Sequence, residues 1–204
     1  AVETDEILRQ ELGGQGISVA SIGPAGERGV AIACIVADGH SFAGRCGLGA
    51  VMGAKKLKAV AVAGRRKPAI ARPEEVASLR KELVALLKDN TRGTMHAHGT
   101  SVLVGPCEEI GDLPIKYWQG DVWPEGAAKI GAPYYGQFFQ ASSWPCAACP
   151  IGCHRRITLP PGSPYEVEGA GAEYESLGML GSCCLVDDLV YIAKANDLCN
   201  RLGI

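Results

Sequence analysis

The chain lacks several features that would assign it to a broad class at once. Over 204 residues, no run approaches the roughly 18–20 consecutive apolar residues of a membrane-spanning helix. There are no internal repeats, no low-complexity tract and no signal-like start. The net charge is only −2, so bulk charge indicates neither a nucleic-acid partner nor an anionic membrane. What remains is a globular chain expected in the cytoplasm, and a start without Met favours a piece of a longer protein.

The composition is that of a packed protein rich in turns. Hydrophobic residues make up 47% of the chain and charged residues 21%, which excludes a disordered protein. The 27 Gly and 12 Pro predict many turns and close backbone approaches. Nine Cys favour a reducing compartment over a framework of disulfides.

The first third of the chain predicts short strands. Apolar runs at 17–22 and 30–36 flank a Gly-Pro-Ala-Gly segment, which predicts two strands joined by a tight connection, and a third run at 57–63 predicts another strand. Helical spacing of apolar residues predicts a helix over 74–88, with one face made by Val76, Leu79, Leu83, Leu86 and Leu87. A boundary between two domains, 1–66 and 67–204, follows from this change of pattern.

Glycines at 44, 47, 49 and 53 have two interpretations. They fit neither G-x-G-x-x-G nor the ending of a phosphate-binding loop. They can serve only to let a strand and a helix pack closely. Alternatively, their N–H groups together with Arg45 can hold an anionic cofactor. Spacing leaves both open.

The sharpest chemical signal is Cys146-x2-Cys149-x3-Cys153. Three thiolates at this spacing, with small residues between them, can converge on an iron–sulfur cluster. A zinc site, a disulfide framework and three unrelated buried thiols are weaker alternatives. A fourth ligand is needed, and the candidates are Cys183, Cys184, Cys199, Cys107, Cys46, Cys34 or a cysteine outside the chain. By default, a lone Cys such as Cys34 fills the core.

Two acidic positions follow the cysteines. Glu173 and Glu175 are two apart, so an extended segment would turn both to one side, as a solvated acidic face or as part of a site. Asp187 is predicted to cap a final helix, with Leu189, Ile192, Leu198 and Leu202 inward and Gly203 near its end.

Several motifs, in order along almost the whole chain, resemble those of the aldehyde ferredoxin oxidoreductases. They are Ser21-Ile-Gly-Pro-Ala-Gly-Glu27, Ala43-Gly-Arg-Cys-Gly-Leu-Gly, Gly111-Asp-Leu-Pro-Ile-Lys116, the cysteine motif, Glu173-Tyr-Glu175-Ser-Leu177 and Ala195-Asn-Asp-Leu-Cys-Asn-Arg-Leu-Gly203. The resemblance implies an α+β fold in which 1–66 ends a β-rich domain that seats the pterins. Residues 67–204 would then be a mainly α-helical domain carrying the cluster.

The resemblance also implies site residues. Cys146, Cys149 and Cys153 would bind a [4Fe-4S] cluster, with the fourth ligand in a third domain. Arg45 and Cys46 would meet the phosphate side of a pterin, although glycine is more usual at position 46. Asn200 stands where the family has the leading Asp of a pterin-binding motif. Glu175 would be the acidic residue near the metal, and it would move a proton.

The implied activity is oxidation of an aldehyde to a carboxylic acid at a tungsten or molybdenum bis-pterin centre. Electrons would leave through the cluster to ferredoxin or another redox subunit, and the enzyme could be a homo-oligomer. Three alternatives stay open: the tungsten subunit of an aromatic acyl-CoA reductase, a bis-pterin molybdenum oxidoreductase, and a module that holds only the cluster and transfers electrons.

Overall fold

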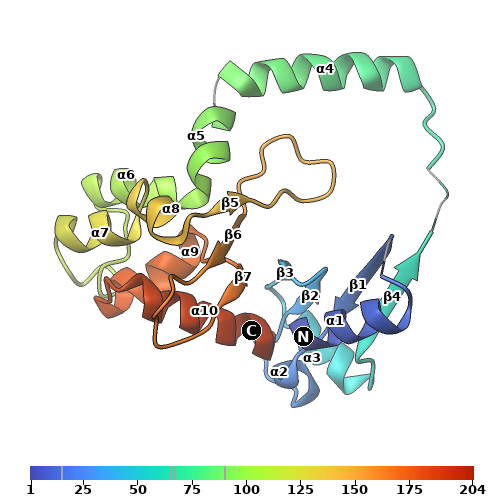
Figure 1. Ribbon diagram of the computed structural model, residues 1–204, viewed down its shortest axis with the longest axis horizontal. Helices are drawn as coiled ribbons and strands as arrows, with labels where there is room; N and C mark the ends of the chain where they lie inside the picture. The colour runs from blue at the N-terminus through green and yellow to red at the C-terminus, as the bar shows by residue number, and fades with distance from the viewer. Residues whose placement is uncertain (15, 65, 67, 90) are drawn as a thin grey trace. The chain divides into compact units, whose positions relative to one another are not determined.

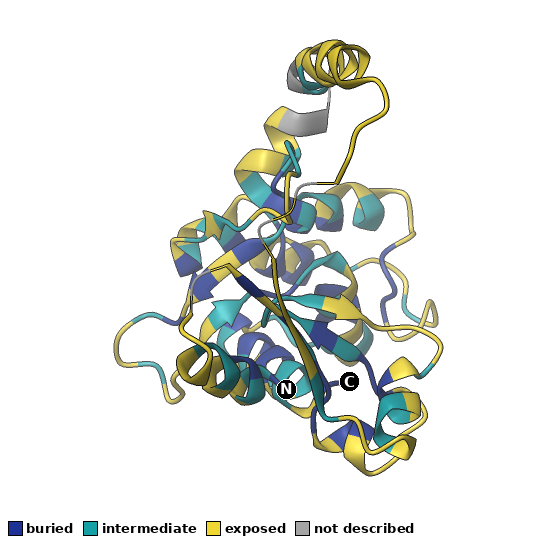
Figure 2. Cartoon of the chain, turned by 90° about the vertical axis from the view of Figure 1, so that its right-hand side faces the viewer, coloured by how far each residue is buried: buried dark blue, intermediate teal, exposed yellow. Residues whose placement is uncertain are grey.

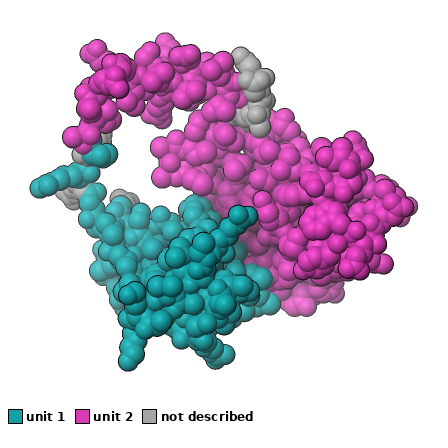
Figure 3. Space-filling view, turned by 180° about the vertical axis from the view of Figure 1, so that it is seen from behind, with its two compact units in different colours: residues 1–68, 197–204 teal, residues 69–196 magenta. Residues whose placement is uncertain are grey.

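The computed structural model describes residues 1–14, 16–64, 66, 68–89 and 91–204. The chain has an α+β fold, as predicted, and divides into two compact units. Unit 1 comprises residues 1–68 and 197–204, and unit 2 comprises residues 69–196 (Figure 3). The predicted domain boundary falls beside residues 65 and 67, which lie outside the described residues.

Unit 1 is built on a four-stranded antiparallel sheet of order β3-β2-β1-β4 (Figure 1). Alternate residues of β1 are buried, namely Ile17, Val19 and Ser21, as the period of a strand requires. Its elements are α1 (Val2–Glu11), β1 (Ile17–Ser21), α2 (Pro24–Glu27), β2 (Ile35–Ala37), β3 (Ser41–Ala43), α3 (Leu48–Ala54) and β4 (Ala59–Ala63).

The predicted tight turn between the first two strands is wrong. A short helix, α2, stands in its place, and the second strand starts only at Ile35. Gly23 is extended and Pro24 occupies the first helical turn, where its fixed φ favours a helix and its missing N–H costs nothing. The strand predicted at 57–63 is confirmed as β4.

Unit 2 is mainly helical and has one small antiparallel sheet of order β5-β6-β7. Its core gathers Val104, Leu113, Ile130, Tyr135 and Leu177, all at most 2% exposed. The elements are α4 (Pro73–Asp89), α5 (Thr91–His98), η1 (Gly99–Leu103), α6 (Val104–Glu109), α7 (Pro124–Ile130), α8 (Tyr134–Phe139), β5 (Ser142–Ser143), β6 (Arg155–Thr158), β7 (Glu168–Ala170), α9 (Tyr174–Ser176), η2 (Leu177–Gly181), η3 (Ser182–Cys184) and α10 (Leu189–Leu202), which ends in unit 1.

The helix predicted over 74–88 is confirmed as α4, but its apolar face is not buried. Val76, Leu79, Leu83 and Leu86 are each about half exposed, and Figure 2 shows the helix in the exposed colour almost throughout. Within the described residues, every helix falls short of the length and apolar character that a membrane crossing needs.

The last helix forms where predicted, with two corrections. Asp188, not Asp187, caps α10: its carboxylate accepts a hydrogen bond from the N–H of Val190 at 2.8 Å, whereas Asp187 pairs with Lys129 at 2.6 Å. Leu189 and Ile192 are buried as expected, but Leu198 and Leu202 are more than 40% exposed. Gly203 adopts a positive φ of 77° and ends the helix.

Candidate functional site

The three predicted cluster cysteines lie on one loop between β5 and β6 of unit 2. The loop turns back on itself through hydrogen bonds from Cys149 N to Cys146 O at 3.0 Å and from Trp144 N to His154 O at 2.8 Å. Cys146 is exposed, and Cys149 and Cys153 are partly buried. The strands therefore hold both ends of the loop and leave its thiols open to a ligand.

The thiols of this loop have different surroundings. Backbone N–H groups of Gly152 and Ile151 donate hydrogen bonds to the Cys149 sulfur and lower its pKa. Burial raises the pKa of the Cys153 thiol, and nearby Glu173, Cys149 and Cys146 raise it further. Because Cys146 and Cys149 both affect the pKa of Cys153, the three sulfurs lie near one another.

The loop fits an iron–sulfur cluster better than the alternatives. All nine cysteines are free thiols, which contradicts a disulfide framework. Among the described residues, no three His, Cys, Asp or Glu side chains are grouped closely enough to hold a single metal ion. A four-iron cluster is larger than one ion and needs ligands set wider apart. N–H groups turned toward sulfur suit it, because such hydrogen bonds stabilise cluster thiolates.

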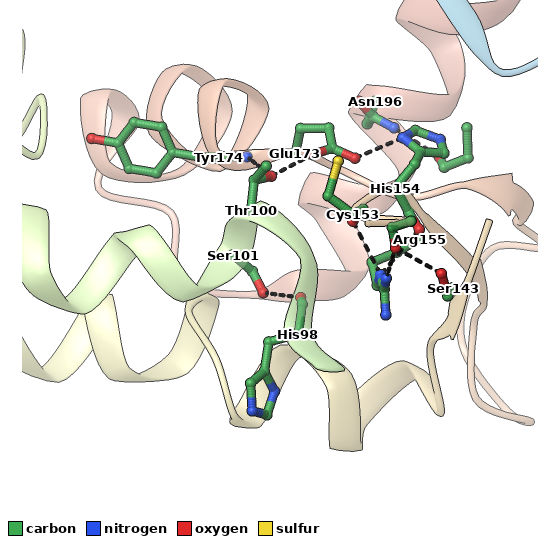
Figure 4. A network of polar contacts seen from close by, with 12 residues as sticks. His98, Thr100, Ser101, Ser143, Cys153, His154, Arg155, Glu173, Tyr174 and Asn196 are labelled. Carbon is green, nitrogen blue, oxygen red and sulfur yellow. Dashed lines mark hydrogen bonds and ion pairs between the residues drawn. The ribbon is translucent and has the colours of Figure 1, made fainter. Parts of the chain in front are cut away.

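A network of polar contacts adjoins this loop (Figure 4). The carboxylate of Glu173 bonds the His154 ring at Nδ1 over 2.6 Å and accepts a hydrogen bond from the Thr100 hydroxyl. The Thr100 oxygen in turn accepts the N–H of Tyr174 at 2.9 Å. The Glu173 side chain therefore ties η1, the start of α9 and the residue after Cys153 together.

Glu175 lies apart from this network. The segment is helical, not extended, so residues two apart do not face the same side. Glu175 is exposed on α9, while Glu173 precedes the helix and points toward His154. The expectation that both carboxylates share a side is wrong, since α9 turns them apart.

Three of the four glycines in 44–53 have a packing role. A Cβ on Gly47 would lie 2.4 Å from the Ala31 oxygen, one on Gly49 2.4 Å from the Cys34 oxygen, and one on Gly53 1.8 Å from the Gly26 oxygen. A Cβ on Gly44 would have no neighbouring atom of the described residues within 4 Å. The close-packing interpretation is confirmed for these three positions.

The loop before α3 carries the predicted pterin contacts. Arg45 and Cys46 are both exposed, and Cys46 has a positive φ of 68°. That conformation suits glycine, which has no Cβ. Asn200 lies near the end of α10. Asn200, Arg45 and Cys46 belong to unit 1, whereas Glu175 and the three cysteines belong to unit 2.

The other cysteines divide between core and surface. Cys34 is 1% exposed and packs with Val36, so it fills the core as expected. Cys183 and Cys184 lie in η3, where the Cys184 thiol faces the Met179 oxygen at 3.5 Å. Both stay candidates for the fourth cluster ligand, although no hydrogen bond among the described residues joins either of them to the cysteine loop.

Comparison with known proteins bears on both units. The family model "Aldehyde ferredoxin oxidoreductase, domains 2 & 3" matches residues 78–204, and the model of the N-terminal domain of the same enzymes matches residues 1–64. This chain belongs to the aldehyde ferredoxin oxidoreductase family. The family resemblance of its motifs is therefore confirmed.

Relatives within the aldehyde ferredoxin oxidoreductase family include two tungsten enzymes from archaea. The tungsten-containing aldehyde ferredoxin oxidoreductase of Pyrococcus furiosus is 40% identical over 99% of this chain, and that of Thermococcus kodakarensis is 38% identical over the same share. The chain spans about a third of each relative's length, 33% in both cases.

A solved structure of another enzyme is similar to this chain in fold. It is described as the active site complex BamBC of benzoyl coenzyme A reductase in complex with 1,5-dienoyl-CoA. The likeness covers 100% of this chain and 32% of that chain, with a TM-score of 0.71 and 22% identity. At this identity the match shows the fold alone.

Two residues beside the cysteine loop have contacts that the sequence did not predict. Glu173 was left open as part of a solvated face or of a site, and its carboxylate bonds His154 directly. Arg155 drew no attention, yet it is only 4% exposed beneath the loop. For Arg155, the sequence offered one indication: an arginine directly after a cysteine motif, at the start of a strand.

Proposed function

We propose that this protein oxidises aldehydes to carboxylic acids, with water as the source of oxygen and ferredoxin or another redox subunit as the electron acceptor. Each turnover releases two electrons and two protons. Membership of the family and the tungsten-containing relatives support an oxidoreductase with a tungsten–pterin cofactor. The observation that carries the proposal furthest is the cysteine loop with its N–H groups on sulfur.

The chain's own contribution is to hold and orient cofactors. Cys146, Cys149 and Cys153 would hold one [4Fe-4S] cluster, and Arg45, Cys46 and Asn200 would contact a pterin. The bound tungsten or molybdenum bis-pterin centre supplies the redox chemistry. Glu175 would give or take a proton near the metal, and its exposure on α9 leaves it accessible for that role.

The cluster assignment is tested by Cys149→Ser in the full-length protein. Iron and sulfide assays with EPR of the reduced protein should show loss of most of the cluster, because one of three thiolates is removed. Cys34→Ala, at a cysteine that is 1% exposed and fills the core of unit 1, serves as the control and should keep the signal. A Cys149→Ser protein with unchanged iron and EPR signal would sink the assignment.

A second candidate, the tungsten subunit of an aromatic acyl-CoA reductase, is favoured by the fold likeness to benzoyl coenzyme A reductase. Substrate assays separate the two. Dye-linked oxidation of aldehydes supports our proposal, and turnover of an aromatic acyl-CoA alone supports the alternative. Finding tungsten or molybdenum with pterin excludes a module that holds only the cluster. We also propose a cytoplasmic location and a homo-oligomer.

A further inference from the structure

Arg155 is a buried cation directly after the cysteine motif. It begins β6, and its residue is only 4% exposed. Burying a charge is costly unless hydrogen bonds satisfy it, so its partners indicate its role. The hydrogen bonds described for its guanidinium all end on backbone carbonyl oxygens, those of Gly152, Cys153 at 3.2 Å, His154 at 3.0 Å, His96 at 3.0 Å and Ala97 at 3.4 Å.

These acceptors belong to two segments. Three of them lie at the end of the cysteine loop, and two lie at the end of α5, nearly sixty residues earlier in the chain. The planar fork of an arginine can reach several acceptors at fixed angles, which a lysine ammonium cannot do. Arg155 therefore fastens the cysteine loop to α5 through the backbone alone.

Two further side chains hold the same loop. The Ser143 hydroxyl donates to the Gly152 oxygen at 2.6 Å, and the His96 ring contacts the Ile151 oxygen through Nδ1 at 2.8 Å. Gly152 has a positive φ of 63°, and a Cβ there would lie 2.5 Å from the Ser143 oxygen. The loop is thus fixed at consecutive carbonyls, with no space for adjustment at Gly152.

Fixing the carbonyls also fixes the N–H groups. A trans peptide is planar, and its C=O and N–H point in opposite directions. When the Gly152 carbonyl turns to Arg155, the N–H of Cys153 must turn the other way. In the preceding peptide the Ile151 carbonyl turns to the His96 ring, and the N–H of Gly152 donates to the Cys149 sulfur. The protein side of the loop carries the acceptors and the thiol side carries the donors.

The positive charge of Arg155, like the N–H donors, favours negatively charged sulfur at the cysteine loop. A cluster held by thiolates adds negative charge at Cys153, the residue before Arg155. Charges that are buried are screened little by water or salt, so the guanidinium attracts that negative charge. Hydrogen bonds to sulfur and net charge near a cluster are both known to set its reduction potential.

We propose that Arg155 is the positioning residue of the iron–sulfur site: it turns the peptide N–H groups of the cysteine loop toward the thiolates and places one buried positive charge beside them. This inference rests on the proposed function, since it presumes that the three cysteines hold a cluster. Arg155 acts through the loop backbone, because its hydrogen bonds end on carbonyl oxygens.

The experiment compares three variants of the full-length protein. Arg155→Met removes both the hydrogen bonds and the charge. Arg155→Lys keeps the charge but loses the planar guanidinium that reaches several acceptors at once. Arg156→Met is the matched control, because Arg156 is the next residue and is exposed, pairing with Glu168 at 2.6 Å. Far-UV circular dichroism and thermal melting check that each variant folds.

Three measurements are made. In cluster-free protein, amide hydrogen exchange at residues 151–153 should be faster in both Arg155 variants than in the wild type and in Arg156→Met. With the cluster bound, iron release to a chelator should be about 10- to 100-fold faster in Arg155→Met, because losing an outer-shell partner costs about that factor in metal affinity. The reduction potential should fall in Arg155→Met and stay closer to the wild-type value in Arg155→Lys.

The two hypotheses fail in different ways. A wild-type protein without iron overturns the proposed function itself. A wild-type protein that holds a cluster, beside an Arg155→Met protein with the same exchange, iron release and potential, overturns the role of Arg155. If Arg155→Met does not fold, Arg155→Lys decides: wild-type exchange and iron release in that variant contradict the inference.

Discussion

At the scale of single residues, Cys46 holds a backbone conformation that side chains disfavour. Its φ of 68° lies in the left-handed region, and the residue is exposed, so little else constrains it. For a residue with a Cβ, this conformation costs roughly 1–2 kcal/mol. Glycine adopts it without that cost but loses more entropy on folding.

Cys46→Gly is therefore expected to stabilise the protein by up to about 1 kcal/mol, which for a chain of this size is about 2–4 °C in melting temperature. Cys46→Ala is the control, because it removes the sulfur and keeps the Cβ, so it should give no gain. Thermal melting followed by circular dichroism measures both. Equal gains in the two variants would refute the backbone explanation.

Glu175 and Glu173 make different predictions. If Glu175 transfers a proton near the metal, Glu175→Gln should lower kcat about 10²- to 10⁴-fold and leave the metal and iron content unchanged. Glu173→Gln is not a neutral control, because Glu173 bonds both His154 and Thr100. Glu166→Gln, an exposed carboxylate of the same unit, serves instead. A near-normal kcat in Glu175→Gln would show that this carboxylate has no part in proton transfer.

Which of these residues the sequence could predict depends on how local their signal is. The spacing of Cys146, Cys149 and Cys153 is local, and the structure places all three thiols on one loop. The bonds from Glu173 to Thr100 and from Arg155 to His96 join positions 73 and 59 residues apart. Contacts of that range depend on the tertiary fold, so no pattern along the chain could predict them.

At the scale of elements, glycines set how closely α2 and α3 approach each other. A Cβ on Gly53 would lie 1.8 Å from the Gly26 carbonyl oxygen, a backbone atom that cannot move aside. Helix propensity alone favours alanine over glycine by about 1 kcal/mol in a helix interior. Packing and propensity therefore predict opposite signs for the same substitution.

Gly53→Ala is expected to destabilise the protein by more than about 2 kcal/mol, because overpacking outweighs propensity. Gly105→Ala in α6 is the matched control: that glycine is exposed, and the space around it is open to 4 Å. It should be neutral or stabilising. Urea unfolding of both variants gives the comparison, and a stabilised Gly53→Ala protein would contradict the close packing.

The prediction of α4 shows what periodicity can and cannot establish. The spacing of Val76, Leu79 and Leu83 predicted the helix correctly, because one face of a helix repeats every three or four residues. The same spacing does not tell whether that face is covered, and these side chains are about half exposed. Periodicity reports that a face is apolar, and what packs on it depends on elements far away in sequence.

At the scale of the whole molecule, the chain carries part of what the proposed reaction requires. It spans a third of the length of its tungsten-containing relatives, and under our proposal it supplies three of the four cysteines of a [4Fe-4S] cluster. We therefore expect the isolated 204 residues to show no dye-linked oxidation of aldehydes, whereas the full-length protein does. Activity of the isolated chain would disprove this.

Unit 1 is assembled from both ends of the chain, and this has a consequence for protein synthesis. The N–H of Cys34 bonds the Gly203 oxygen at 2.8 Å, and the Leu202 carbonyl lies so near Gly23 that a Cβ there would be 2.2 Å away. Unit 2 is one continuous segment, residues 69–196. On the ribosome, the sheet of unit 1 can pair once Ala63 has emerged, but the contacts of Gly23 and Cys34 wait for some 140 further residues, at about 5–20 residues per second, and unit 2 can complete its contacts first. Unit 1 therefore begins to emerge before unit 2 and completes its packing after it, so the surface around Gly23 and Cys34 stays open to chaperones for several seconds.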